Sequence, residues 1–182
     1  MTNYLALFRG INVSGKNIIR MEGLRRLLED AGYENVKTYI QSGNVVFAGK
    51  ERSKEKLAKA IEKLVEEEYG YSISVFVIDK NHLEKAIANN PYAEGKTPEE
   101  AGTKKIYVTF LSDKPSAEAM ENLKQVPMGA DEIAFHDDIL YFKLAIGAAD
   151  SKLSNNLIES RLKLKATTRN WNTTLKLSEM MR

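Results

Sequence analysis

Apolar residues recur along this chain with two spacings, one typical of strands and the other typical of amphipathic helices. The apolar run Tyr4–Phe8 predicts a strand over residues 4–9, whereas Met21, Leu24 and Leu28 follow the spacing of one helix face. Ser42-Gly43 separates two further strand-like segments and predicts a tight hairpin. The elements expected in the first half are a strand at 4–9, a helix at 21–31, strands at 36–41 and 44–48, a helix capped by Ser53 and closed by Gly70, and a strand at 72–78.

The second half repeats most of this order. A short helix at 81–88 and a linker at 89–104 precede it, and Thr97-Pro98-Glu99-Glu100 predicts one helical turn inside the linker. We expect the last strand of this half to be replaced or shortened, because only helical patterns follow its hairpin. The elements expected are a strand at 105–111, a helix at 116–125, hairpin strands at 132–136 and 139–144 around Asp137-Asp138, a helix at 153–164 and a last short helix at 172–180.

The element order predicts the fold class. Strand, helix, hairpin, helix and strand in succession is the βαββαβ order of ferredoxin-like domains. We therefore predict an α+β protein made of two ferredoxin-like units in tandem with antiparallel sheets, the second with a modified end and an extra C-terminal helix. The expected domains are residues 1–79, a helix and linker at 80–104, and residues 105–182. Several strands are apolar on both faces, so we expect the open sheet faces to be covered, most simply by each other.

Composition is that of an ordinary globular protein, with 43% apolar and 29% charged residues in 182 positions. The absence of cysteine excludes a thiolate nucleophile and a sulfur-ligated metal, and it favours the cytoplasm. The apolar run near the start is too short for a membrane span. His82 and His136 have no partner at metal-ligand spacing, so we expect neither a metal nor a cofactor.

The net charge of +2 is unevenly distributed. Residues 152–182 hold seven Lys or Arg against two Glu, a net charge of +5, which leaves −3 for the remainder. A basic end of this kind is suited to a polyanion, although a solvated helix surface explains it more simply. RNA binding is disfavoured, because the strand expected at 44–48 lacks the aromatic consensus of RNA-binding domains.

Residues 10–17 have the spacing G-x-x-x-x-G-K of a phosphate-cradling P-loop. However, Asn17 stands where a Ser or Thr would hold magnesium, and hairpins disagree with a parallel P-loop sheet. Asp79, which a P-loop protein would use for the metal, is explained as a helix N-cap. We interpret the segment either as a simple turn or as a loop that offers Arg9, Lys16 and backbone N–H groups to an anion.

Residues 167–173 read Thr-Thr-Arg-Asn-Trp-Asn-Thr, which is unusually polar for a segment between two apolar helices. Arg169 beside a helix N-terminus is suited to a phosphate or carboxylate, because free N–H groups and the helix dipole favour negative charge. Capping by Thr and Asn, with Trp171 as an anchor, explains the same residues structurally.

Five motifs stand out along the chain: Arg9-Gly10-Ile11-Asn12-Val13 with Gly15-Lys16-Asn17, Met21-Glu22-Gly23-Leu24-Arg25, Tyr39-Ile40-Gln41-Ser42-Gly43-Asn44-Val45-Val46-Phe47, Asn90-Pro91, and Ala166-Thr167-Thr168-Arg169-Asn170-Trp171-Asn172-Thr173. With these motifs, the sequence resembles the bacterial domain-of-unknown-function family 1697 over nearly its whole length. The resemblance implies a tandem of ferredoxin-like units and no established activity. Ser14 departs from the glycine that the resemblance leads us to expect in the first motif.

Three hypotheses for function follow, and the sequence leaves open whether the protein is an enzyme. The first is a cytosolic protein that binds a small anion or phosphorylated ligand between its two halves. The second is an enzyme acting on a phosphorylated or nucleotide-like metabolite, with Gln41 and Asn44 orienting the substrate. The third is an interaction module whose basic C-terminal segment docks a protein or nucleic acid. The candidate ligand-binding residues are Arg9, Asn12, Lys16, Gln41, Asn44, Arg169 and Asn172.

Overall fold

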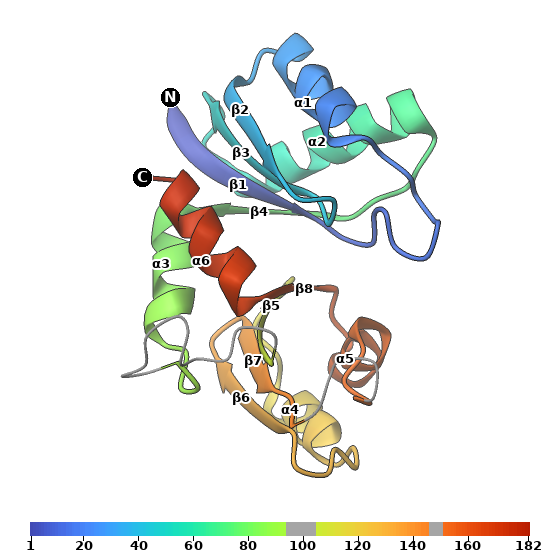
Figure 1. Ribbon diagram of the computed structural model, residues 1–182, viewed down its shortest axis with the longest axis vertical. Helices are drawn as coiled ribbons and strands as arrows, with labels where there is room; N and C mark the ends of the chain where they lie inside the picture. Colours follow the sequence, from blue (N-terminus) through green and yellow to red (C-terminus); the bar gives the residue numbers. More distant parts are fainter. Residues whose placement is uncertain (94–104, 146–150) are drawn as a thin grey trace. The chain divides into compact units, whose positions relative to one another are not determined.

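The computed structural model describes residues 1–93, 105–145 and 151–182. These residues form an α+β protein with two four-stranded antiparallel sheets and six helices (Figure 1), so the predicted α+β class and antiparallel sheets are confirmed. The chain divides into two compact units, Met1–Leu83 with Leu177–Arg182 and Glu84–Lys176. Most of the predicted linker at 89–104, including the helical turn expected at Thr97-Pro98-Glu99-Glu100, lies outside the described residues.

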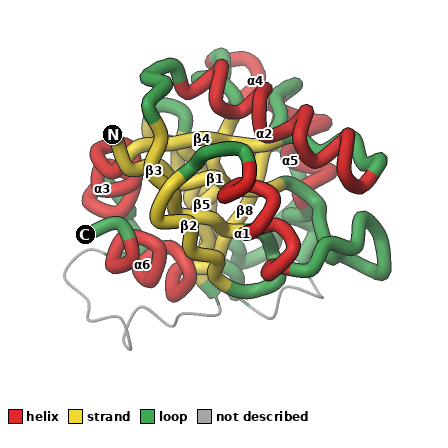
Figure 2. The backbone as a smooth tube through the Cα atoms, turned by 90° about the horizontal axis from the view of Figure 1, so that it is seen from above, coloured by secondary structure: helices red, strands yellow, loops and turns green. Residues whose placement is uncertain are grey.

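The first unit has its elements where the apolar pattern predicted them. Strand β1 is central in the sheet order β2-β3-β1-β4 and runs antiparallel to both of its neighbours. Figures 1 and 2 both show α1 lying across the strands of this sheet. The expected hairpin is confirmed, with a turn of residues 40–43 between its strands. The elements are β1 (Thr2–Phe8), α1 (Met21–Asp30), β2 (Glu34–Tyr39), β3 (Asn44–Gly49), α2 (Lys54–Tyr69), β4 (Val75–Asp79) and α3 (Lys80–Ala88).

Local hydrogen bonds explain where α2 begins and ends. The Ser53 hydroxyl accepts a hydrogen bond from the Lys56 N–H at 3.2 Å, which satisfies one of the unpaired donors of the first turn. At the other end, Gly70 adopts the left-handed conformation with φ +72° and donates its N–H to the Glu66 carbonyl. Both boundaries predicted from the sequence are therefore confirmed, for the reasons that predicted them.

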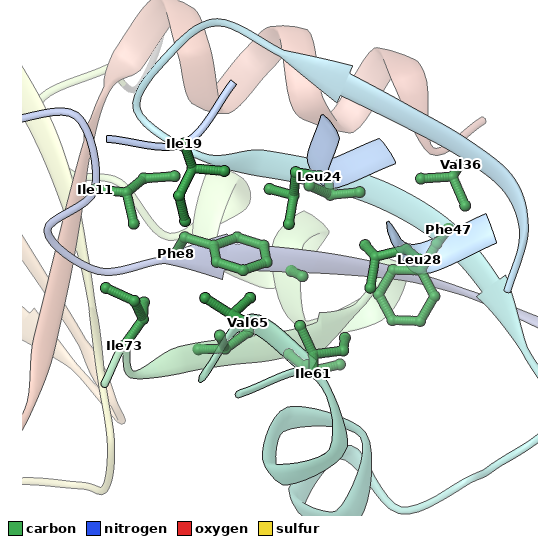
Figure 3. Packing of buried hydrophobic residues seen from close by; sticks show 14 of the residues in the cluster. Phe8, Ile11, Ile19, Leu24, Leu28, Val36, Phe47, Ile61, Val65 and Ile73 are labelled. Atoms are coloured by element: carbon green, nitrogen blue, oxygen red, sulfur yellow. The ribbon is translucent and has the colours of Figure 1, made fainter. Parts of the chain in front are cut away.

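The core of the first unit lies between one face of its sheet and the helices α1 and α2. Figure 3 shows Phe8 of β1 in this cluster together with Leu24 of α1 and Val65 of α2. Leu5 and Leu7, which alternate with the core residues of β1, are also buried, as the apolar pattern on both strand faces led us to expect. The expectation that the two sheets cover each other stays a prediction.

The second unit also contains a four-stranded sheet, with the order β6-β7-β5-β8. Its hairpin at Asp137-Asp138 is confirmed, with Asp137 in the left-handed region at φ +49°. Ser116 and Ser154 cap its first two helices through their hydroxyl groups. The elements are β5 (Ile106–Leu111), α4 (Ala117–Lys124), β6 (Glu132–His136), β7 (Ile139–Lys143), α5 (Asn155–Leu162), β8 (Ala166–Asn170) and α6 (Trp171–Met180).

The expectation of a replaced or shortened final strand in this unit is wrong. Strand β8 pairs with β5 over five residues, and it is as long as β4 of the first unit. Its polar side chains find partners inside the sheet, since the hydroxyl oxygens of Thr109 and Thr168 lie 2.7 Å apart across the two strands. Threonine is a good strand former because it is β-branched. The polarity of the segment therefore concealed a strand.

Asp79 caps α3, as the sequence predicted. Its Oδ1 accepts from the His82 N–H at 2.8 Å and its Oδ2 from Lys54 Nζ at 3.1 Å. Burial raises the pKa of Asp79, but the hydrogen bonds from His82 and Lys54 outweigh burial and leave the pKa below its ordinary value. The carboxylate form is therefore the one that the fold stabilises.

We expect Asp79→Ala to lower the free energy of unfolding by about 1 kcal/mol at pH 7, and Asp79→Asn to lose less because an amide oxygen also caps helices. Because the pKa is lower in the folded state, the carboxylate contributes above its unfolded pKa of about 4 and loses that contribution as the pH falls further. Urea unfolding at pH 7 and pH 3 measures both losses. A loss for Asp79→Ala that is equal at the two pH values would contradict this role.

Candidate functional site

The segment between β1 and α1, residues 9–20, is braced by one side chain. We name this segment the β1–α1 loop. Asn12 Nδ2 donates to the carbonyl oxygens of Ile19 at 2.9 Å and Gln41 at 2.8 Å, and Asn12 Oδ1 accepts from the Ile19 N–H at 2.8 Å. One amide thus closes the loop on itself and ties it to the β2–β3 turn.

Further bonds fix the inside of the β1–α1 loop. The Asn12 N–H donates to the Asn17 carbonyl at 3.2 Å, and Asn17 Nδ2 donates to the Gly10 carbonyl at 3.1 Å. Ile11 and Ile19 are each only 1% exposed and belong to the same core cluster as Phe8 (Figure 3). The loop is therefore attached to the core at both ends, and its tip is left in solvent.

The backbone of the β1–α1 loop visits the left-handed region five times, at Gly10, Asn12, Ser14, Gly15 and Asn17. Alternation between right-handed and left-handed backbone conformations can point successive N–H groups to the same side. Backbone nests that bind anions have this geometry. The N–H groups of Ser14, Gly15 and Asn17 donate no hydrogen bond to any of the described residues. Ser14, where the family resemblance suggested glycine, adopts φ +51°.

Charge on the β1–α1 loop is of one sign. Its charged residues are Arg9, Lys16 and Arg20, and it contains no Asp or Glu. Lys16 and Arg20 are exposed, whereas Arg9 is half-buried and donates its backbone N–H to the Ser74 carbonyl at 3.0 Å. Basic side chains in a segment without Asp or Glu, together with N–H groups that donate no hydrogen bond to the described residues, favour an anionic ligand over a neutral one.

The two candidate residues of the β2–β3 hairpin differ in what they can do. Gln41 is exposed and contributes its carbonyl oxygen to the contact with Asn12. Asn44 is fully buried, and its Nδ2 donates to the Tyr39 carbonyl at 2.9 Å and to the Ser42 hydroxyl at 3.0 Å. Both amide hydrogens of Asn44 therefore serve the turn, and Gln41 is the side chain of the pair that solvent reaches.

Arg169 and Asn172, the candidates in the second unit, occupy a strand and a helix. Arg169 lies on β8 opposite Val108 and is 7% exposed, and its Nη1 donates to the Thr167 hydroxyl at 2.8 Å and the Thr168 carbonyl at 2.9 Å. Burial lowers the pKa of Arg169 to about 10, so the guanidinium stays charged at neutral pH. Asn172 is exposed in the first turn of α6.

Asn170, rather than Asn172, provides the cap of α6. Its Oδ1 accepts a hydrogen bond from the Thr173 N–H at 2.8 Å, and the Thr174 hydroxyl donates to its carbonyl at 2.9 Å. Trp171 is 4% exposed, as an anchoring residue would be. The structural explanation considered for this polar segment therefore accounts for Asn170 and Trp171.

The first unit contains a depression of about 450 Å³, which we name the Tyr69 depression. The sequence did not predict it. It combines the end of the β1–α1 loop with the first turns of α1 and the last residue of α2. One signal for it was present, because a glycine inside a predicted helix often marks close packing. The lining residues are Ile18, Arg20, Glu22, Gly23, Arg26 and Tyr69.

The described part of the chain contains neither a metal-binding cluster nor a membrane-spanning helix. No three His, Asp or Glu side chains there gather closely enough to hold a metal ion. None of the helices in residues 1–93, 105–145 and 151–182 has the length and apolar character needed to cross a membrane.

Comparison with known proteins gives a family and a fold. A family model described as "Protein of unknown function (DUF1697)" matches residues 1–141. Among solved structures, the conserved bacterial protein SP0830 from Streptococcus pneumoniae is similar, with a TM-score of 0.76 and 24% sequence identity over 100% of this chain and 99% of that chain. At this identity the similarity concerns the fold alone. No curated protein matches the sequence.

Proposed function

The chain belongs to the DUF1697 family of proteins of unknown function, as its polar motifs predicted, and we propose that it binds a small anion or phosphorylated ligand at the β1–α1 loop. One observation carries this proposal: the unsatisfied N–H groups of Ser14, Gly15 and Asn17 lie in a braced loop whose charged side chains are all basic. A fixed set of donors binds an anion with little further loss of conformational entropy.

Binding, rather than catalysis, is the function that this loop supports best. An anion there would accept hydrogen bonds from backbone N–H groups, with Lys16 contributing a flexible positive charge. Gln41 is the neighbouring side chain that could orient a ligand, since Asn44 is buried and committed to the turn. A catalytic role with Gln41 and Asn44 orienting a substrate stays a prediction.

Five finer expectations from the sequence are kept as part of this proposal. The order βαββαβ and the antiparallel sheets support ferredoxin-like units, and the domain limits at 1–79, 80–104 and 105–182 stay predictions. A cytoplasmic location also stays a prediction. So does the participation of Arg169 and Asn172 in the same ligand site, and the use of the basic C-terminal segment by a protein or nucleic acid.

We expect titration with inorganic phosphate to shift the backbone amide NMR signals of Ser14, Gly15 and Asn17 in the wild-type protein. Lys16→Gln is expected to weaken this binding about fivefold, because one exposed charge-assisted contact is worth about 1 kcal/mol. Raising the salt concentration should weaken binding to the wild type more than to the variant.

Lys59→Gln is the matched control, because Lys59 is an exposed lysine on α2 of the same unit. This variant should bind phosphate as the wild type does. If no amide of the β1–α1 loop shifts, or if the two lysine variants lose the same affinity, the proposal fails.

A further inference from the structure

The Tyr69 depression is of a size that fits a small molecule. Its volume of about 450 Å³ falls within the range of about 300–1,000 Å³ found for ligand pockets. It adjoins the β1–α1 loop, because Ile18 and Arg20 belong to both. A ligand whose anionic group lies at the end of the loop would therefore have room for its remaining atoms here.

Gly23 of α1 lines the Tyr69 depression. A Cβ atom at this position would lie 2.9 Å from the Tyr69 hydroxyl, closer than side chains normally approach. Glycine within a helix is less favourable than alanine by about 1 kcal/mol, so α1 forgoes stability where Tyr69 approaches it. The close approach leaves the Tyr69 hydroxyl beside the backbone of α1, at the edge of the depression.

The Tyr69 hydroxyl has no hydrogen-bond partner within the described part of the chain. Burial and the neighbouring Glu68 carboxylate raise the pKa of Tyr69. The hydroxyl therefore stays protonated at neutral pH and can donate a hydrogen bond. The Tyr69 ring is stacked on Tyr71, with 6.1 Å between centroids and 10° between planes. Tyr69 therefore presents a donor together with an aromatic surface.

The charged side chains around the depression differ in whether they already form ion pairs. Glu22 is occupied, since Arg25 donates to both of its carboxylate oxygens and Arg26 Nε donates to Oε1 at 3.1 Å. These bonds, that from Arg25 first, lower the pKa of Glu22 to about 2. The Arg20 side chain, in contrast, forms no hydrogen bond or ion pair with any of the described residues. One uncommitted guanidinium thus lines the same depression as the unpartnered Tyr69 hydroxyl.

Apolar surface accompanies these polar groups. Ile18 is 52% exposed, which is unusual for a side chain of its size, and it lines the same depression. An inorganic anion would leave this surface in water, whereas an organic anion with a ring would cover it. Arginine also stacks well on aromatic rings.

We propose that the Tyr69 depression binds a small aromatic anion, whose phosphate or carboxylate is held by Arg20 and the Tyr69 hydroxyl and whose ring covers Ile18. The inference rests on the proposed anion-binding function of the β1–α1 loop and specifies its ligand class. Phosphate and carboxylate are the two sources of the negative charge, and they differ in charge and number of oxygen acceptors.

The test compares four probes by NMR titration of the full chain: phenyl phosphate, benzoate, inorganic phosphate and phenol. Phenyl phosphate or benzoate is expected to bind at least about fivefold more tightly than inorganic phosphate, and phenol is expected not to bind. Arg20→Gln should weaken binding of the aromatic anion about tenfold, and Tyr69→Phe about threefold. Which of the two aromatic anions binds more tightly identifies the acidic group.

Two further variants make the test specific. Arg52→Gln is the charge-matched control, because Arg52 precedes α2 while Tyr69 ends it, and the helix separates them by about 24 Å. It should bind the aromatic anion as the wild type does. Gly23→Ala keeps every charge but displaces the flexible end of Tyr69, so it should weaken the aromatic anion and leave inorganic phosphate unaffected.

The outcomes separate this inference from the function on which it rests. If inorganic phosphate binds and depends on Lys16, but Arg20→Gln and Gly23→Ala leave binding of the aromatic anions unchanged, the inference fails and anion binding by the loop stands. If none of the charged probes shifts any amide of the loop or the depression, both fail. If Arg52→Gln weakens the aromatic anions as much as Arg20→Gln does, general electrostatic attraction replaces the proposed site.

Discussion

Asn12→Ala is expected to lower the free energy of unfolding by about 3–4 kcal/mol and to abolish phosphate binding at the β1–α1 loop. The substitution removes three hydrogen bonds, two to the Ile19 backbone and one to the Gln41 carbonyl. Each contributes about 1 kcal/mol, and the left-handed φ of +54° adds further strain for alanine. Urea unfolding and the phosphate titration measure the two effects.

Asn35→Ala is the matched control for this variant. Asn35 has almost the same backbone conformation, with φ +52°, but it is exposed and its side chain forms no hydrogen bond within the described residues. Its replacement should cost about 1 kcal/mol, from backbone strain alone. Asn12→Gly avoids the backbone strain but still loses the three hydrogen bonds. Its cost should therefore lie between those of Asn35→Ala and Asn12→Ala. Equal losses for Asn12→Ala and Asn35→Ala would show that the Asn12 amide does not brace the loop.

Gly43→Ala is expected to destabilise the protein by about 2–4 kcal/mol, because the new methyl group has no space. A Cβ atom there would lie 2.6 Å from Ile11 Cδ1 and 2.7 Å from Phe8 Cβ, and Gly43 also has φ +87°. Phe8 cannot move aside easily, since its N–H donates to the Gly43 carbonyl at 2.9 Å. We expect a lower thermal midpoint together with changed NMR signals for the methyl groups of Ile11.

Gly70→Ala separates crowding from backbone strain in this experiment. Gly70 has a similar left-handed conformation, with φ +72°, but nothing lies within 4 Å of an added Cβ atom. Its replacement should cost about 1 kcal/mol. The interpretation of Gly43 requires a clearly larger loss there than at Gly70, and similar losses at the two positions would refute it.

Several features of this fold were predictable because they depend on neighbours in the chain. The cap by Ser53, the left-handed Gly70 and the cap by Asp79 each involve hydrogen bonds over three or four residues. The hairpin at Asp137-Asp138 likewise depends on a two-residue turn. Interactions of this range are encoded by residue type and spacing, so the α+β class and the order of the elements other than β8 followed from the pattern of apolar residues.

Strand β8 escaped prediction because its partner lies far away in the sequence. The hydroxyl groups of Thr109 and Thr168 satisfy each other only when β5 and β8 are adjacent, and 59 positions separate the two threonines. Without that partner, a segment of Thr, Arg and Asn has the polarity of a loop. The same limitation explains why Arg169 was interpreted as a residue beside a helix rather than as a buried strand residue.

The sequence by itself determined the elements other than β8 and their order, the absence of cysteine chemistry and the concentration of glycine, amide and basic residues at positions 9–17. Only the tertiary structure decided that Asn12 joins the β1–α1 loop to Gln41, that Asn44 is committed to its turn, and that Gly23 of α1 meets Tyr69 of α2. The physical reason is the range of the interactions. Helix periods and caps act within a few residues, whereas a pocket forms from side chains that packing brings together from distant segments.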